Sequence, residues 1–217
     1  ADEAVAALPK AYGGETRMGR AVTDVLEAAD GAEAGDGGFA DAGGAGEEGD
    51  AVIDVQLSDG QSEILIGTRD GKAIRFGEDD VRSMGRTAYG VRGISLKDDD
   101  SVVGMEAVKP GGSILTVTEH GYGKRTEIEE YRVQTRGGVG IINIAASERN
   151  GEVVGVAYVQ ESDEILLITQ QGMILRMPTN DVRAIGRATQ RDTASGCIWP
   201  MRLGTSSPNT MVMQVMA

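Results

Sequence analysis

Several residue types are scarce in this sequence: its 217 residues include one cysteine, one histidine, one tryptophan and two phenylalanines. A single cysteine cannot form an internal disulfide or a cysteine cluster for a metal, and His120 has no second histidine or clustered acids at ligand spacing. No apolar run approaches the roughly 20 residues of a membrane-spanning helix, and the N-terminus lacks the pattern of a signal peptide. We therefore expect a cytoplasmic protein with no metal site and no membrane partner.

Catalytic signatures are absent as well. The sequence has no Gly-x-Ser-x-Gly motif for a serine nucleophile, and no pair of carboxylates stands out from the solvated acids. Gly121-Tyr122-Gly123-Lys124 looks like part of a phosphate-binding loop, but no strand–GxxxxGK–helix pattern surrounds it, so a tight hairpin is the better interpretation. From the residues alone we assign no catalytic group.

The negative charge is concentrated at one end of the chain. Residues 1–60 contain three basic and fourteen acidic residues, whereas residues 61–217 contain 18 basic and 20 acidic ones. The formal net charge of -13 would normally argue against nucleic acid as a partner. Because the second part is nearly neutral and its arginines are regularly placed, the overall charge does not exclude such a partner.

The first fifty residues form a distinct segment. Gly31–Asp50 consists of eight Gly, five Ala, six Asp or Glu and one Phe, which bury too little apolar surface to offset the entropy of ordering them. We predict that residues 1–50 are a poorly structured, acidic Gly/Ala-rich segment, with short helices as candidates at residues 2–9 and 21–29. The chain begins with Ala rather than Met, so we expect a fragment or a processed product.

A hairpin pattern recurs three times after residue 60. Short apolar runs meet at Asp70-Gly71, His120-Gly121 and Gln171-Gly172, with the glycines 50 and 51 residues apart, and two further apolar runs follow each hairpin. Four short strands per period predict an all-β, β-propeller-like fold with about three four-stranded blades. We place a partial propeller at 51–217, with blades at about 61–108, 112–159 and 163–217. Since three blades leave edges open and a strand at 51–57 is left over, we expect an incomplete ring.

Three arginines follow each turn glycine at fixed steps of four, eleven and fifteen residues. The step-four arginines are Arg75, Arg125 and Arg176. The step-eleven arginines are Arg82, Arg132 and Arg183. The step-fifteen arginines are Arg86, Arg136 and Arg187. Cations at one position of successive blades lie at regular intervals along a rim, an arrangement that suits contacts with the phosphates of a DNA duplex.

Two interpretations compete for these arginines. The step-eleven arginines have acids two or three residues before them in the chain, which favours structural ion pairs. The step-fifteen arginines lie in Gly-rich loops with no adjacent acid, which favours phosphate contact. Our candidate DNA-binding residues are the step-four and step-fifteen arginines together with Lys124, Arg132, Gly137 and Gly138.

Three long strings resemble a known family. EILIGTRDGKAIRFGEDDVRSMGRTAYGVRGISL, ILTVTEHGYGKRTEIEEYRVQTRGGVGIINI and DEILLITQQGMILRMPTNDVRAIGRATQ are similar to the last three blades of the C-terminal domain of gyrase A, one of the two proteins of DNA gyrase. The resemblance implies a β-pinwheel, a propeller-like fold whose basic rim wraps double-stranded DNA and supports ATP-dependent negative supercoiling by the holoenzyme.

The same resemblance implies partners and cofactors outside this chain. The partners are gyrase B and the remainder of gyrase A, and ATP and magnesium belong to the holoenzyme, so we expect no cofactor here. The family's basic box, QRRGGKG, has its nearest likeness in Gln134–Gly140, where Thr and Val replace basic residues. The alternative is a protein-interaction or assembly module of a type II topoisomerase, such as that of topoisomerase IV, that does not itself bind DNA.

Overall fold

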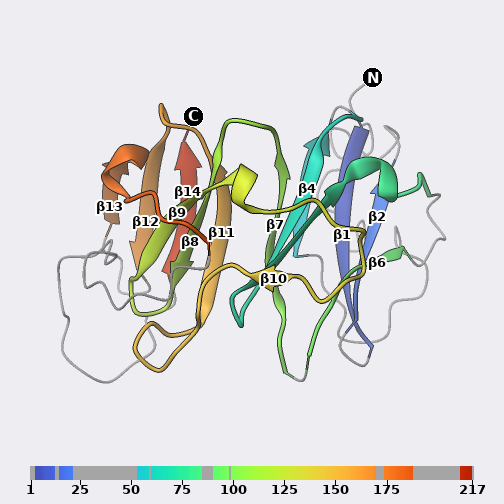
Figure 1. Ribbon diagram of the computed structural model, residues 1–217, viewed down its shortest axis with the longest axis horizontal. Coiled ribbons are helices and arrows are strands. Elements are labelled where there is room, and N and C mark those ends of the chain that lie inside the picture. Colours follow the sequence, from blue (N-terminus) through green and yellow to red (C-terminus); the bar gives the residue numbers. More distant parts are fainter. Residues whose placement is uncertain are drawn as a thin grey trace, which may run out of the picture.

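The computed structural model describes residues 3–12, 15–21, 53–58, 60–84, 90–97, 99–169, 174–187 and 211–216. These residues form strands joined by turns and three short 3-10 helices, which confirms the expected all-β class. Figure 1 shows the sheets side by side along the long axis of the molecule, with the N-terminal sheet at one end and the C-terminal sheet at the other. No helix among the described residues is long and apolar enough to cross a membrane.

The strands form four antiparallel sheets, which we call blades 1 to 4. Blade 1 has the order β3 (Asp54–Ser58), β1 (Glu3–Tyr12), β2 (Glu15–Ala21), β6 (Val91–Ser95). Blade 2 has the order β10 (Ile141–Ile142), β5 (Lys72–Gly77), β4 (Glu63–Thr68), β7 (Val102–Val108). Blade 3 has the order β11 (Val153–Val159), β8 (Ser113–Thr118), β9 (Gly123–Glu127). Blade 4 has the order β13 (Ile174–Pro178), β12 (Glu164–Thr169), β14 (Met211–Met216).

Successive units of the chain exchange a strand. β6 follows the β4–β5 hairpin in the sequence but pairs with β2 of blade 1, and β10 follows the β8–β9 hairpin but pairs with β5 of blade 2. A 3-10 helix follows the second strand of each repeated hairpin, namely η1 (Glu78–Asp80), η2 (Ile128–Glu130) and η3 (Thr179–Asp181). Blades 1, 2 and 3 are therefore joined by main-chain hydrogen bonds as well as by side-chain packing.

Two turn glycines have the geometry that the hairpin pattern requires. Gly71 and Gly121 have φ values of 81° and 76°, in the left-handed region that favours glycine. A Cβ atom at Gly71 would lie 2.2 Å from the carbonyl oxygen of Ile144. The absence of a side chain at Gly71 therefore lets the segment after β10 approach the β4–β5 turn.

The N-terminal part of the chain differs from the prediction. Glu3–Tyr12 is a strand, so the predicted helix at residues 2–9 is wrong, because pairing with β2 and β3 outweighs the weak helical preference of an alanine-rich run. The strand left over at 51–57 is β3, which pairs with β1, and the described chain therefore has four sheets where the sequence predicted about three. Gly31–Asp50 and the second predicted helix, apart from Ala21, lie outside the described residues.

The hydrophobic core lies mainly between blades. Leu65 of blade 2 packs in one cluster with Ile114 and Tyr131 of the following unit, and Leu115 of blade 3 packs in another with Ile165 of blade 4. Both faces of the central strands are covered, since every residue of β8 is buried. This burial explains why the central apolar runs do not alternate with polar residues.

Candidate nucleic-acid interface

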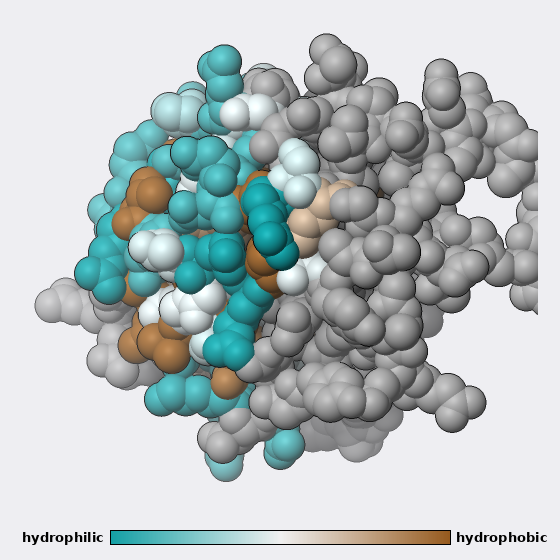
Figure 2. Space-filling view, turned by 90° about the vertical axis from the view of Figure 1, so that its right-hand side faces the viewer, coloured by the Kyte–Doolittle hydropathy of each residue, from teal (hydrophilic) through white to brown (hydrophobic). Residues whose placement is uncertain are grey.

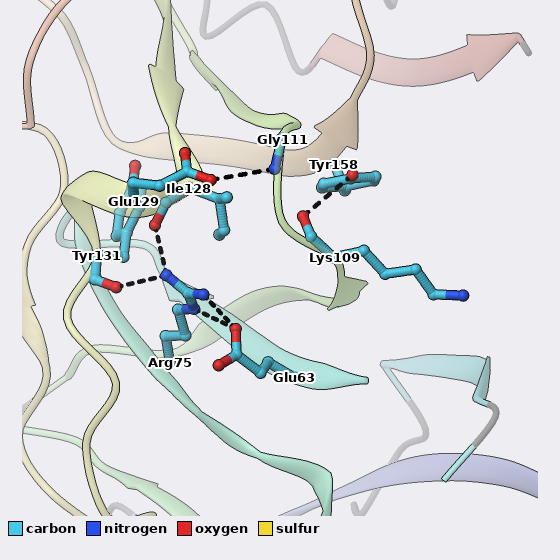
Figure 3. A network of polar contacts seen from close by, with 8 residues as sticks. All are labelled: Glu63, Arg75, Lys109, Gly111, Ile128, Glu129, Tyr131 and Tyr158. Carbon is cyan, nitrogen blue, oxygen red and sulfur yellow. Dashed lines mark hydrogen bonds and ion pairs between the residues drawn. The ribbon is translucent and has the colours of Figure 1, made fainter. Parts of the chain in front are cut away.

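Arg75 lies inside the junction between blades 2 and 3. Its guanidinium forms an ion pair with Glu63 and donates hydrogen bonds from Nη1 to the carbonyl oxygens of Ile128 (2.7 Å) and Tyr131 (2.8 Å), as Figure 3 shows. The residue is only 8% exposed. Arg75 therefore joins the two blades, and its donors point away from any external phosphate.

The other two step-four arginines have different surroundings. Arg176 forms an ion pair with Glu164, and its side chain is 61% exposed. Arg125 is half-buried, and its Nε atom is buried without a hydrogen-bond partner. The same repeat position thus holds an arginine in a buried ion pair, one in an exposed ion pair, and one with no ion pair among the described residues.

The step-eleven arginines point to solvent. Arg82 and Arg132 are exposed, and neither forms an ion pair with another residue that the structure describes. For Arg82 and Arg132, the ion pairs that the sequence favoured, with Asp80 or Glu130 for example, are not made among the described residues. Arg183 is also exposed, and its carbonyl oxygen accepts a bond from the backbone N–H of Arg125 (3.2 Å). This row offers guanidinium groups that a phosphate can reach.

The step-fifteen arginines are partly committed to the backbone. Arg136 donates to the carbonyl oxygens of Asp80 (2.8 Å) and Arg92 (3.2 Å). Arg187 donates to the equivalent carbonyls of Glu130 (3.2 Å) and Ile142 (2.8 Å). Both use Nε and Nη1, so Nη2 has no partner among the described residues. Arg86, the first of this set, lies outside the described residues.

Lys124 and the two glycines of the Gly-rich loop have structural surroundings. Lys124 is 6% exposed, and its Nζ donates to the carbonyl oxygen of Arg187 (2.9 Å). Burial, and then the charge of Arg187, lower the pKa of Lys124 to about 8. Gly137 and Gly138 bond to β6 through the backbone, with Gly137 N–H donating to Gly93 (2.6 Å). These three residues hold the connector against the preceding blade.

One further position carries information that the sequence-based prediction did not use. The residue twelve places before each step-four arginine is Glu63, Ser113 or Glu164. In the structure it stands on the neighbouring strand, because Leu65 pairs with Arg75, Leu115 with Arg125 and Leu166 with Arg176. A comparison of the three repeats at this step would have predicted which arginine lacks a carboxylate.

One side of the described surface carries both hydrophilic and hydrophobic residues. On the side turned to the viewer in Figure 2, hydrophilic residues predominate, and smaller hydrophobic patches lie between them. Among the residues that the structure describes, no group of three or more histidine, cysteine or acidic side chains is placed to hold a metal ion. The arrangement of arginines is therefore the feature that points most directly to a ligand, and the ligand it suits is a polyanion.

A family model described as the DNA gyrase C-terminal domain, a β-propeller, matches residues 62–109, 112–160 and 163–190. Among curated proteins, the A subunit of DNA gyrase from Haloquadratum walsbyi is 51% identical over 142 residues, which are 64% of this chain and 17% of that protein. The A subunit of DNA gyrase from Klebsiella oxytoca is 48% identical over 143 residues, 66% of this chain and 16% of that protein. The chain thus matches only about a sixth of the length of these relatives.

Two solved structures have a similar fold. A DNA gyrase A C-terminal domain superposes with a TM-score of 0.71 and 26% sequence identity, covering 86% of this chain and 59% of that domain. The C-terminal domain of a DNA topoisomerase IV gives the same TM-score with 24% identity, covering 86% of this chain and 55% of that domain. These similarities support the expected β-pinwheel.

Proposed function

This chain belongs to the family of the DNA gyrase C-terminal domain, and on that premise we propose that it is a non-catalytic module that binds double-stranded DNA. The observation that carries the proposal is the row of exposed step-eleven guanidiniums, in which Arg82 and Arg132 have no acidic partner among the described residues. Repeated cations that contact phosphates bind a duplex without reading its sequence. Such contacts allow the duplex to bend around successive blades.

Membership of the family supports a more specific proposal for the biological role. The chain would wrap a DNA segment and so support ATP-dependent negative supercoiling by a holoenzyme in the cytoplasm. Gyrase B and the remainder of gyrase A would be its protein partners, and ATP and magnesium would bind outside this chain. The step-fifteen arginines would add contacts through Nη2, while Arg75 supports the interface only by joining blades.

The salt dependence of duplex binding tests this proposal. Each phosphate contact contributes about 0.9 to the slope of log affinity against log salt concentration, so Arg82→Ala with Arg132→Ala should lower the slope by about 1.8. Fluorescence anisotropy with a linear duplex at several salt concentrations measures it. The double variant Arg136→Ala with Arg187→Ala is measured for comparison. It should also lower the stability of the fold, because four hydrogen bonds to backbone carbonyls are lost. An unchanged slope in the Arg82 and Arg132 variant contradicts the assignment.

A protein-assembly module is the second candidate. The outer edge of β13 pairs with no other strand that the structure describes, and Ile174 on that strand is 65% exposed. Edges of this kind accept strands from other chains. A gel-shift titration on linear duplex at low salt, with residues 31–50 present and deleted, separates the candidates. Failure of both proteins to bind would favour assembly, whereas tighter binding after the deletion would show that the acidic segment competes with DNA.

A further inference from the structure

A serine in the hairpin of blade 3 occupies the position that holds a glutamate in the hairpins of blades 2 and 4. Arg125 on β9 occupies the place of Arg75 and Arg176, each of which forms an ion pair with a glutamate on the neighbouring strand. Ser113 stands at the glutamate position on β8 and is 8% exposed. We call the surroundings of Arg125, Ser113 and Thr179 the Arg125 junction.

Arg125 has no substitute partner in the part of the chain that the structure describes. Its Nε is buried and unbonded, and no hydrogen bond or ion pair of its side chain occurs among the described residues. Glu127 lies two residues along β9 on the same face, but it is exposed and forms no ion pair with Arg125. A buried guanidinium N–H without an acceptor costs free energy, so the site favours any acceptor that can enter. The side chain as a whole is half-buried and can be reached from solvent.

A second unpartnered polar group lies in the same junction. Thr179 begins η3 as Ile128 begins η2, and the carbonyl of Ile128 is one of the groups that Arg75 contacts. Thr179 is 0% exposed, yet its hydroxyl has no hydrogen-bond partner among the described residues. By this equivalence the Arg125 junction has a threonine where the Arg75 junction has an isoleucine.

The charges around this junction favour an anion. Lys124 precedes Arg125 on β9 and projects from the opposite face, and its Nζ is held at the backbone of Arg187. Its neighbour Arg187 lowers the pKa of Lys124 further than burial alone does. Glu130 acts on Lys124 in the opposite sense to Arg187. On the face of Arg125, Ser113 of β8 replaces the glutamate whose charge pairs with Arg75 and Arg176 in the other hairpins.

We propose that the Arg125 junction binds a phosphate oxyanion. The guanidinium of Arg125 is the principal hydrogen-bond donor, and Ser113 stands at the position of the glutamate without supplying a negative charge. Guanidinium groups bind phosphate with paired, charge-assisted hydrogen bonds, the same geometry that they offer to a carboxylate. The phosphate comes either from a DNA backbone, in which case the inference rests on the proposed function, or from free inorganic phosphate.

The test uses the full 217-residue chain and two probes at constant ionic strength. Inorganic phosphate replaces chloride while the NMR signal of Arg125 Nε–Hε and the melting temperature Tm are followed. We expect the signal to shift and Tm to rise. Ser113→Glu supplies the internal carboxylate and should abolish both responses, whereas Ser113→Gln, of similar size without charge, should retain them. Arg125→Gln provides a second loss variant if Ser113→Glu does not fold.

Duplex DNA is the second probe and identifies the source of the phosphate. A backbone phosphate at this site predicts that Ser113→Glu lowers the salt slope of DNA affinity by about 0.9, with Ser113→Gln unchanged. A response to inorganic phosphate with an unaltered DNA slope supports a site for free phosphate. If the wild-type protein binds no DNA, the proposed function fails while the inorganic arm still decides this inference. Equal phosphate responses in wild type, Ser113→Glu and Arg125→Gln, or none in wild type, overturn it.

Discussion

The Arg125 junction and its equivalent around Arg75 share a backbone register but differ in how their polar groups are satisfied. At the Arg75 junction the guanidinium bonds to Glu63 and two carbonyls, and the Tyr131 hydroxyl donates to Asn143 (2.6 Å), whose amide donates to Thr116 (2.9 Å). At the Arg125 junction both Arg125 Nε and Thr179 Oγ1 lack partners among the described residues. One repeated arginine thus joins two blades in one repeat and makes no such side-chain contact among the described residues in the next.

The largest effect is expected from removing the arginine of the closed junction. Arg75→Ala leaves a partly buried Glu63 and two carbonyls without their donor, so we expect a loss of about 3–5 kcal/mol in the free energy of unfolding. Arg125→Ala removes a group with no bonded partner and should change stability by less than about 1 kcal/mol. Urea denaturation of both variants measures the contrast. Equal losses would show that the two junctions are alike in solution.

An intermediate effect is expected from a carboxyl on β7, which belongs to neither junction's ion pair. Burial, and then the charge of Asp54, raise the pKa of Glu106 from 4.5 to about 7. The folded protein therefore binds more protons than the unfolded chain between these values. Its stability should fall as the pH rises from about 4.5 to about 7 and then level off, by roughly 3 kcal/mol from this group.

Glu106→Gln tests this dependence. In the variant, most of the decline in stability between pH 4.5 and 7 should disappear, and the variant should be more stable than wild type at pH 8. Thermal unfolding at a series of pH values measures both effects. Arg75→Ala is a useful control, because it should lower stability at every pH without removing the decline. A decline that persists unchanged in Glu106→Gln would assign the titration to another group.

The smallest effect is expected at the exposed step-four pair. Glu164→Gln removes the partner of an arginine whose side chain is 61% exposed, and exposed ion pairs contribute about 0.2–1 kcal/mol. We expect a loss of less than about 0.5 kcal/mol, measured by urea denaturation at low salt and further reduced at high salt. A loss comparable to that of Arg75→Ala would mean that burial does not explain the difference between the repeats.

Much of the fold could be predicted from local patterns. The turn glycines, the apolar runs and the period near fifty residues indicated repeated hairpins, and the glycines at 71 and 121 have the expected positive φ. The β1–β2 hairpin could not be recognised from the repeat, because its arginine pattern is incomplete. Arg17 stands four residues after Gly13 and pairs with Leu8, as Arg75 pairs with Leu65, but no arginine follows at steps eleven and fifteen.

The candidate site was less predictable. The sequence pattern favoured phosphate contact for the step-fifteen arginines over the step-eleven ones, because only acids nearby in the chain can be recognised from sequence. In the structure Arg136 bonds to carbonyls 56 and 44 residues away, whereas Arg82 and Arg132 make none of the local ion pairs that were expected. The carbonyls that accept hydrogen bonds from Arg75, Arg136 and Arg187 come from the preceding or following unit.

The sequence by itself determined the all-β class, the repeat and the positions of the arginines, because turn chemistry and apolar patterning act over a few residues. Only the tertiary structure decided which arginines are satisfied. Blade packing brings the carbonyls of Ile128 and Tyr131 to Arg75, across 53 and 56 residues. The carboxylate partner of a step-four arginine stands twelve residues earlier in its own hairpin, where the sequence can reveal it, whereas the carbonyl acceptors come from the neighbouring blade, where adjacency along the chain does not specify them.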